Sequence, residues 1–199
     1  AVLEIHLSGD RKDARVKKFI AQAEAAGTRM LNSDSDKLDA LVGTRRHQGV
    51  VAEIDATRRD IKLADVLDSL EENALILVLD GVQDPHNLGA CLRVADAAGA
   101  HAVVAPRDRA VGLNATAIKV ASGAADTVPY ITVTNLARAL REMQEAGVWV
   151  VGAAGDATKS VHDIDQKVPL AWVLGAEGDG LRRLTRETCD ELARIPMYG

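Results

Sequence analysis

The stretch Asn87-Leu-Gly-Ala-Cys-Leu-Arg93 follows a short apolar run at Leu75–Leu79 and starts a helical pattern. A second stretch, Leu174-Gly-Ala-Glu-Gly-Asp-Gly-Leu181, follows an apolar run at Leu170–Leu174, and a third, Ile195-Pro-Met-Tyr-Gly199, ends the chain. In an open α/β sheet, the loops that follow the strands together form a ligand crevice. The three stretches therefore predict an α/β fold with a ligand site at one edge of its sheet.

The rest of the second half of the chain agrees with this fold. Apolar runs short enough to be buried strands alternate with helical patterns, and short connections of this kind predict a doubly wound, mostly parallel sheet with helices on both faces. The expected strands are Leu75–Leu79, Ala102–Ala105, Tyr130–Val133, Val148–Val151 and Leu170–Leu174, and the expected helices are 88–98, 114–122, 135–146 and 181–193.

The N-terminal part predicts a separate small α/β domain over residues 1–55. Its expected strands are Val2–Leu7, Arg29–Leu31 and Val50–Ile54, and the intervening segments have the apolar periodicity of helices. Residues 56–72 are polar and charged and are interpreted as a linker that carries one helix. The larger domain then spans residues 73–199.

Composition limits the possible functions. The chain has 199 residues and a net charge of −5, and residues 61–199 hold 13 Lys and Arg against 19 Asp and Glu. There is no long apolar span and no secretory leader, so we expect a cytoplasmic protein without a membrane partner. The five histidines lack metal-ligand spacing, and neither a P-loop nor a nucleophile elbow is present, so no metal site is expected.

The stretch around Asn87 offers two interpretations. Asn87 could simply cap a helix, with Arg93 solvated on its surface. However, the helix is rich in alanine and is expected to pack closely, which would leave Arg93 projecting over the strand ends. An arginine there suits contacts to phosphate or ribose, because its guanidinium fork stays charged.

The loop after Leu174 does not fit a dinucleotide site. Its glycines run G-x-x-G-x-G, and the carboxylates of Glu177 and Asp179 would repel a pyrophosphate. They suit a neutral or cationic ligand such as a sulfonium, which the glycine backbone could approach closely. The alternative is an ordinary helix N-terminus with acidic capping residues. Ile195-Pro-Met197 is interpreted as a brief strand that could form a wall for an adenine.

Together, these motifs resemble the SpoU (TrmH-like) branch of the SPOUT methyltransferases. The resemblance rests on Asp84-Pro-His-Asn-Leu-Gly-Ala-Cys-Leu-Arg93, on the loop 174–180 and on the start of a third motif at Ile195. It implies a trefoil knot, S-adenosyl-L-methionine as methyl donor, a homodimer, and transfer to the ribose 2′-hydroxyl of a guanosine in 23S rRNA. His47-Gln-Gly-Val50 likewise resembles the end of an L30e-like RNA-binding domain.

The resemblance also implies roles for individual residues. Asn87, Arg93 and Glu177 would be catalytic and face the RNA. The cofactor would be bound by Leu174, Gly175, Ala176, Glu177, Gly178, Ile195, Pro196 and Met197. Two basic pairs, Lys17-Lys18 and Arg45-Arg46, would contact the RNA backbone through the small domain.

Two expectations concern the ends of the chain. The family continues beyond Gly199 with a Ser- and Asn-containing segment and a last helix, so the C-terminus is expected to be truncated, and a chain that ended there is expected to be inactive. The start at Ala1 likewise suggests an incomplete N-terminal domain.

Three other functions stay open: tRNA 2′-O-methylation, a nucleotide-dependent oxidoreductase, and a non-catalytic RNA-binding or ribosome-assembly module.

Overall fold

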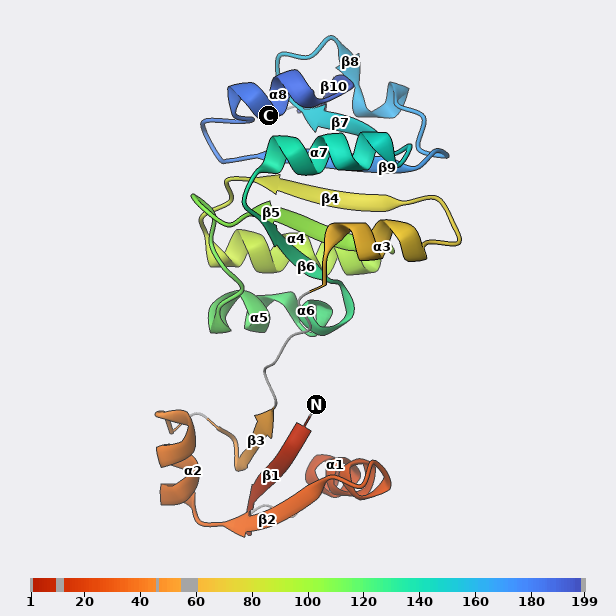
Figure 1. The fold of residues 1–199 in the computed structure, drawn as a ribbon. Helices are drawn as coiled ribbons and strands as arrows, with labels where there is room; N and C mark the ends of the chain where they lie inside the picture. The colour runs from red at the N-terminus through yellow and green to blue at the C-terminus, as the bar shows by residue number, and fades with distance from the viewer. Residues whose placement is uncertain (1, 10–12, 46, 55–60, 198–199) are drawn as a thin grey trace. The chain divides into compact units, whose positions relative to one another are not determined.

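The chain forms two compact units, Ala1–Asp60 and Ile61–Gly199 (Figure 1). The structure, a computed structural model, describes residues 2–9, 13–45, 47–54 and 61–197. The boundary between the units falls inside the stretch 56–72 that was expected to be a linker. The helix expected there is α3 (Leu63–Ser69), and it packs in the second unit, where Leu63 and Val66 are buried.

The first unit is a small α/β layer. It contains β1 (Val2–Ser8), α1 (Ala14–Ala25), β2 (Arg29–Ser33), α2 (Ser35–Val42) and β3 (Val50–Ile54), and its strand order is β2-β1-β3. β1 pairs in parallel with β2 and antiparallel with β3. Both helices begin at an aspartate whose carboxylate accepts backbone N–H groups, Asp13 for α1 and Asp34 for α2. The core joins Ile5 and Leu7 of β1 to Ala23 of α1.

The second unit is a seven-stranded sheet with the order β6-β5-β4-β9-β7-β10-β8. Every strand pairing recorded in this sheet for the described residues is parallel. This confirms the predicted α/β class. In chain order, the elements after α3 are β4 (Leu75–Asp80), α4 (Pro85–Ala97), β5 (Ala102–Pro106), α5 (Ala115–Ala121), α6 (Ala124–Thr127), β6 (Tyr130–Val133), α7 (Leu136–Glu145), β7 (Trp149–Ala153), β8 (Lys159–Ser160), the short 3-10 helix η1 (Val161–Asp163), β9 (Leu170–Gly175), α8 (Arg183–Thr188) and β10 (Glu191–Arg194).

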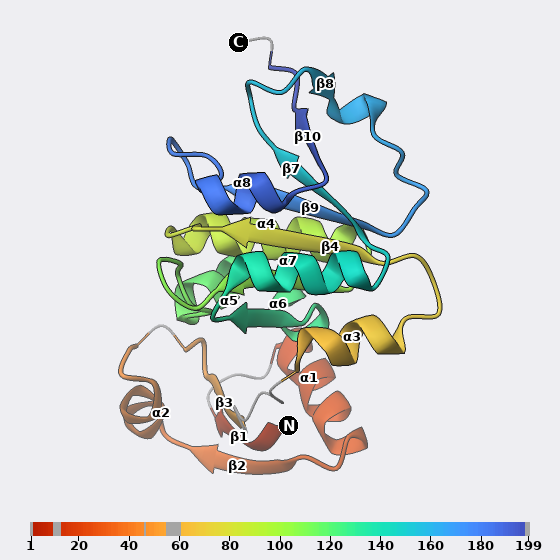
Figure 2. The same cartoon turned by 45° about the horizontal axis from the view of Figure 1, so that its top comes forward.

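Helices cover both faces of this sheet, as the sequence predicts. In Figure 2, α7 lies in front of the strands and α4 lies behind them. One core cluster packs α3 and α7 against residues such as Ile76 and Val173, and another packs α4, α5 and α6 against residues such as Leu79 and Val103. Successive side chains of a strand point to opposite faces, so a strand buried on both sides needs a continuous apolar run.

The neighbouring strands β4 and β9 set the position of the functional site. Their registers align Leu79 with Leu174 and Asp80 with Gly175. The chain leaves β4 toward α4 and leaves β9 toward α8, so the loops that carry the first two sequence motifs start side by side. Strand order and chain order diverge at this point of the sheet, which is where open α/β sheets bind ligands.

Two expected elements near the C-terminus are wrong. The predicted helix 181–193 ends after Thr188, and Glu191–Arg194 forms β10 in parallel with β7 and β8. The carboxylate of Asp190 accepts the backbone N–H of Val150 at 2.8 Å and a side-chain N–H of Gln144 at 2.9 Å. For residues 191–194, strand pairing with β7 therefore outweighs the helical pattern of the local sequence. The brief strand expected at Ile195–Met197 is wrong as well, because β10 ends at Arg194.

Candidate methyl-transfer site

A cavity of about 630 Å³ opens at the carboxyl ends of β4 and β9. One wall is the loop Gly81–Asp84 with the first turns of α4, and the other wall is the loop that follows β9. The lining residues are Leu79, Gly81, Val82, Gln83, Asp84, Asn87, Ala90, Cys91, Leu174, Gly175, Ala176, Glu177 and Asp179. The fold therefore brings together Asn87 and the loop 174–179, as the sequence predicts.

Asn87 is available for a ligand because another residue caps α4. The N-cap is Asp84, whose Oδ1 accepts the backbone N–H of His86 at 2.9 Å, and Pro85 occupies the first helical position. The same hydrogen bond lowers the pKa of the Asp84 carboxyl below its usual value. The interpretation of Asn87 as a helix cap is therefore wrong: it lies in the first turn, exposed, with its side chain on the cavity.

The loop after β9 is a tight hairpin built from glycine. Two backbone hydrogen bonds of 3.0 and 2.9 Å close it between Ala176 and Gly180. A Cβ atom on Gly175 would lie 2.1 Å from the carbonyl carbon of Gly180, so no other residue fits at this position. Gly178 at the tip has φ +84°, a left-handed conformation that glycine adopts without strain. The hairpin therefore offers main-chain atoms in a fixed arrangement, together with the exposed carboxylates of Glu177 and Asp179.

A buried carboxylate ties the two cavity walls together. Asp80, at the end of β4 and 1% exposed, accepts the backbone N–H of Arg182 at 2.9 Å. Its other oxygen accepts the guanidinium of the same residue. Arg182 lies two residues after Gly180, which closes the glycine hairpin, so Asp80 fixes where the chain leaves that hairpin. The sequence analysis missed this pair, although an aspartate that ends an apolar strand immediately before a glycine is a usable signal for such a role.

The structure places Arg93 beside the cavity and not in its lining. An α-helix turns about 100° per residue, so Asn87 and Arg93 leave α4 about 120° apart. Arg93 lines a separate groove of about 670 Å³ between α4 and α5, together with His86, Ala115, Thr116, Lys119, Val120 and Ser122. The two helices pack closely because Gly89 leaves room for Ala117 and Val120.

A second, apolar cavity of about 310 Å³ shares Leu174 with the first. Trp172, Ala153 and Ile195 also line it, and these apolar walls would accept a flat aromatic group such as adenine. Ile195 and Leu174 are thus brought together as expected. Gly178, Pro196 and Met197 line neither cavity, and Met197 is 81% exposed.

These features fit S-adenosyl-L-methionine chemically. The adenine would need the apolar walls near Leu174 and Ile195, and a positively charged sulfonium is favoured near the carboxylates of Glu177 and Asp179. Burial raises the pKa of the Cys91 thiol in the cavity, so this thiol stays protonated at neutral pH and is a poor nucleophile. The residues that line the cavity therefore favour methyl transfer from a bound cofactor over catalysis by a cysteine nucleophile.

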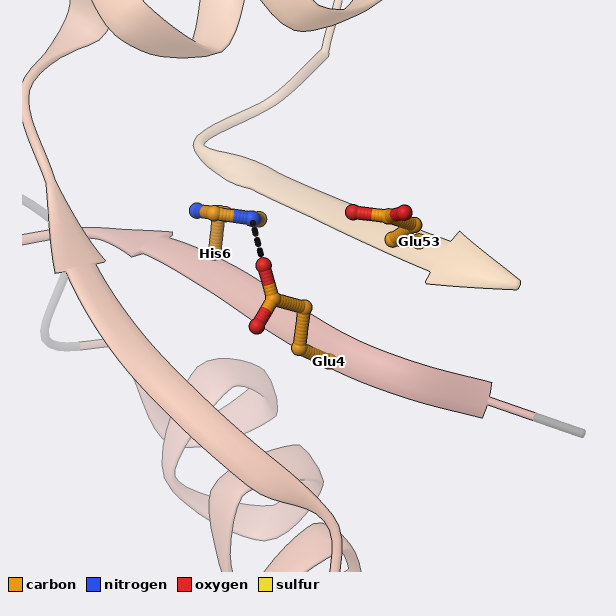
Figure 3. A group of neighbouring side chains, drawn as sticks. All are labelled: Glu4, His6 and Glu53. Carbon is orange, nitrogen blue, oxygen red and sulfur yellow. Dashed lines mark hydrogen bonds and ion pairs between the residues drawn. The ribbon is translucent and has the colours of Figure 1, made fainter. Parts of the chain in front are cut away.

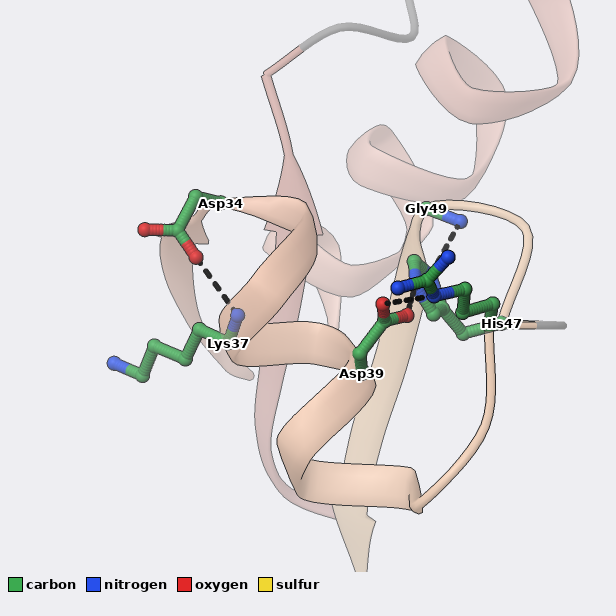
Figure 4. A network of polar contacts seen from close by, with 6 residues as sticks. Asp34, Lys37, Asp39, His47 and Gly49 are labelled. Atoms are coloured by element: carbon green, nitrogen blue, oxygen red, sulfur yellow. Dashed lines mark hydrogen bonds and ion pairs between the residues drawn. The ribbon is translucent and has the colours of Figure 1, made fainter.

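The basic residues predicted to bind RNA through the first unit lie on its surface. Lys17 and Lys18 are exposed on α1, and Arg45 is 93% exposed, with Nε 3.5 Å from Oδ2 of Asp39. Arg46 lies outside the described residues. Asp39 also accepts from Nε2 of His47 at 2.8 Å, while Nδ1 of His47 accepts the N–H of Gly49 at 3.0 Å (Figure 4). The imidazole therefore links Asp39 to Gly49 and orders the turn before β3.

One group in the first unit has metal-ligand geometry. The ligand atoms of Glu4, His6 and Glu53 all lie within 4.8 Å of one another (Figure 3). The ring of His6 already contacts Ser33 Oγ at 3.0 Å and Glu4 Oε1 at 3.1 Å, and Arg29 lies 3.6 Å from the other oxygen of Glu4. The protein itself thus provides partners for the imidazole and for one of the two carboxylates.

The fold and the cavity define the class of protein. The second unit is a doubly wound parallel sheet with a cavity at the point where the strand order reverses. Main-chain atoms, an amide and carboxylates line this cavity. These features are typical of α/β proteins that bind a small organic ligand. In the part of the chain that the structure describes, no helix has the length and apolarity to cross a membrane.

The chain belongs to the SpoU rRNA Methylase family, which matches residues 74–199. Residues 2–59 match a second family, RNA 2′-O ribose methyltransferase substrate binding. The two matched ranges correspond closely to the two units of the fold.

Relatives are similar along the whole chain. The 23S rRNA (guanosine-2′-O-)-methyltransferase RlmB of Ralstonia nicotianae is 60% identical over 98% of this chain and 79% of that protein. The RlmB of Neisseria meningitidis serogroup B is 51% identical over 100% of this chain and 80% of its own length. The chain thus spans about four fifths of these relatives.

Solved structures share the fold at lower identity. The SpoU methyltransferase AviRb of Streptomyces viridochromogenes, in complex with the cofactor AdoMet, superposes with a TM-score of 0.78 at 23% identity, over 100% of this chain and 75% of that one. The AdoMet-bound rRNA methyltransferase of Sinorhizobium meliloti gives a TM-score of 0.74 at 24% identity, over 100% of this chain and 72% of that one. This similarity extends to both units.

Proposed function

We propose that the protein transfers a methyl group from S-adenosyl-L-methionine to the ribose 2′-hydroxyl of a guanosine in 23S rRNA. The observation that carries this proposal is the cavity at the ends of β4 and β9, where Asn87 faces the glycine hairpin with Glu177. The family of the chain and the names of its relatives support the same reaction. Bound cofactor would supply an electrophilic methyl carbon, which bonds to the ribose oxygen as its bond to sulfur breaks.

The cofactor would be bound by the residues around Leu174. The main-chain groups of Leu174, Gly175 and Ala176 line the cavity, and Ile195 lies across the apolar cavity that shares Leu174. Gly178, Pro196 and Met197 would lie at the edge of this cofactor site. The carboxylates of Glu177 and Asp179 favour a cationic ligand. The demethylated product is neutral, so the same carboxylates hold it less strongly, and this favours its release.

Asn87 and Arg93 would act on the RNA. The Asn87 amide can donate to and accept from a hydroxyl, so it can hold the 2′-oxygen in line with the methyl carbon, and alignment is the main requirement of such a transfer. Arg93 stays protonated and would hold the adjacent phosphate from the groove between α4 and α5. The hydroxyl proton would pass to solvent or to Glu177. The basic pairs Lys17-Lys18 and Arg45-Arg46 would hold RNA on the first unit.

We also propose a homodimer formed through the second unit, with a knotted chain path, in the cytoplasm. Val94 is 64% exposed in the middle of α4, and Val94 and Ala98 also line the apolar cavity, so a second copy on this face would pack beside the proposed adenine site. A helix face of this kind can pack closely against a second copy. Sedimentation of the full-length protein tests the dimer: we expect a two-chain species, and a monomer at micromolar concentration would contradict it.

The methylation proposal is tested with labelled S-adenosyl-L-methionine and transcripts of 23S rRNA and tRNA. We expect label in 23S rRNA only, on the 2′-oxygen of one guanosine. Label in tRNA would instead support the related tRNA activity. Binding of cofactor and rRNA without transfer would support a non-catalytic RNA-binding module.

A further inference from the structure

Four cations lie on α4, on α5 and in the loop after β5, which are elements near the cavity, although the second unit as a whole is acidic. They are Arg93 on α4, Arg107 and Arg109 in the loop after β5, and Lys119 on α5, and we name them the basic rim. All four side chains are exposed. The unit carries 13 Lys and Arg against 19 Asp and Glu, and the cavity lining itself includes Asp84, Glu177 and Asp179, so the positive charge is confined to the rim residues.

The rim cations have no carboxylate partner among the described residues. Among the described residues of the same unit, Lys159, Arg182, Arg183 and Arg186 each form an ion pair, whereas Arg138 and Arg141 on α7 form none and therefore match the rim cations in this respect. Of the acids near the rim, Asp84 contacts His86 at 3.2 Å and Asp96 accepts the hydroxyl of Thr127 at 2.6 Å, whereas Glu177 and Asp179 face the cavity. Asp108 lies between Arg107 and Arg109 in the sequence. Its single negative charge is smaller than the four positive charges of the rim residues, so the rim keeps a net positive charge.

The fold positions the rim beside the site. The loop after β5 is tied to the first cavity wall by a 2.8 Å hydrogen bond from Val111 N–H to the carbonyl of Val82. The carbonyl of Arg109 lies 3.7 Å from the Cβ position of Gly81, which is a cavity residue. Arg109 has φ +59°, a left-handed conformation that is uncommon for a residue with a side chain. Lys119 and Arg93 share the groove between α4 and α5.

We infer that the basic rim binds the phosphate backbone of the RNA on either side of the methylated nucleotide, with Arg109 and Lys119 as binding residues outside the catalytic group. This inference rests on the proposed function. Unpaired cations around a polar cavity suit a polyanion, because a phosphate chain passes over several of them while one ribose enters the cavity. A groove of about 670 Å³ beside the cavity gives the chain room to continue.

The test compares two double variants of the full-length protein. Arg109→Gln/Lys119→Gln removes two rim charges, and the control Arg138→Gln/Arg141→Gln removes two exposed charges from α7, which lies on the other face of the sheet. Affinity for a 23S rRNA fragment is measured from about 50 to 300 mM salt. For the rim variant we expect about tenfold weaker binding at low salt and a salt slope smaller by about 1 to 2. The control should keep the wild-type slope.

Two further measurements make the result interpretable. Calorimetry with S-adenosyl-L-methionine should give wild-type affinity for both double variants, which shows that the cavity is intact. The charge-conserving variant Arg109→Lys/Lys119→Arg should restore the salt slope. An unchanged slope in the rim variant would overturn the inference while leaving the proposed function in place. Failure of the wild-type protein to bind rRNA would contradict the proposed function, and this inference with it.

Discussion

Oδ2 of Asp80 accepts the backbone N–H of Arg182 at 2.9 Å, and Oδ1 accepts Nε–H of the same residue at 2.5 Å. One buried carboxylate thus satisfies both the main chain and the side chain of a residue far away in the sequence. The contact joins the end of β4 to the start of α8, and the glycine hairpin lies between β9 and α8. The shape of the cavity depends on this junction.

Removal of Asp80 should destabilise the second unit. Asp80→Ala leaves a partly buried guanidinium and a backbone N–H without their acceptor, so we expect the free energy of unfolding to fall by about 3 kcal/mol. Denaturant unfolding followed by tryptophan fluorescence reports this unit, because Trp149 and Trp172 both belong to it. The control Arg183→Ala removes an exposed i,i+4 pair and should cost less than about 0.5 kcal/mol. Equal losses for both variants would contradict the account.

Gly175 should tolerate no side chain. In Gly175→Ala the new Cβ would lie 2.1 Å from a backbone carbon of Gly180, so the hairpin must open. We expect the affinity for S-adenosyl-L-methionine, measured by calorimetry, to fall at least tenfold. Gly112→Ala is the matched control, because its Cβ would meet no atom within 4 Å and its φ is ordinary. Wild-type affinity in Gly175→Ala would show that the hairpin does not bind the cofactor.

Asn87 should matter for the reaction and little for stability. It does not cap α4, so Asn87→Ala should change the unfolding free energy by less than about 0.5 kcal/mol. We expect kcat for methylation of an rRNA fragment to fall by about 100-fold, with little change in cofactor affinity. The comparison variant Asp84→Ala removes the true N-cap and should lower stability. A large stability loss in Asn87→Ala would assign that residue a structural role instead.

Several of these features could be predicted from sequence, and others could not. The apolar runs predicted five strands of the second unit because strands buried on both faces leave a local signature. β10 was missed because Glu191–Arg194 carries no such run and depends on pairing with β7. The pair of Asp80 with Arg182 and the separation of Arg93 from the cavity depend on contacts between distant parts of the chain. A local pattern can mark one partner, such as the aspartate that ends the apolar run before Gly81, but it does not identify the residue that the aspartate contacts.

The stability of the second unit should fall in alkaline solution. Burial raises the pKa of the Cys189 thiol from its ordinary value near 9 to about 11, with smaller contributions from Asp190 and Asp80. The folded chain holds this proton more tightly than the unfolded chain, so the stabilisation is complete below pH 9 and is lost as the pH rises toward 11. Denaturant unfolding between pH 8 and about 11 should therefore show a shallower decline for Cys189→Ala. Parallel declines in the two proteins would contradict the prediction.

The most direct measurement is mass spectrometry of 23S rRNA after incubation of the full-length protein with deuterated-methyl S-adenosyl-L-methionine. We predict one labelled guanosine with the label on the ribose 2′-oxygen, and no label with Asn87→Ala or Gly175→Ala beyond about 1% of the wild-type level. Label on a base nitrogen or carbon, or wild-type labelling by both variants, would contradict the claim that this cavity transfers a methyl group to ribose.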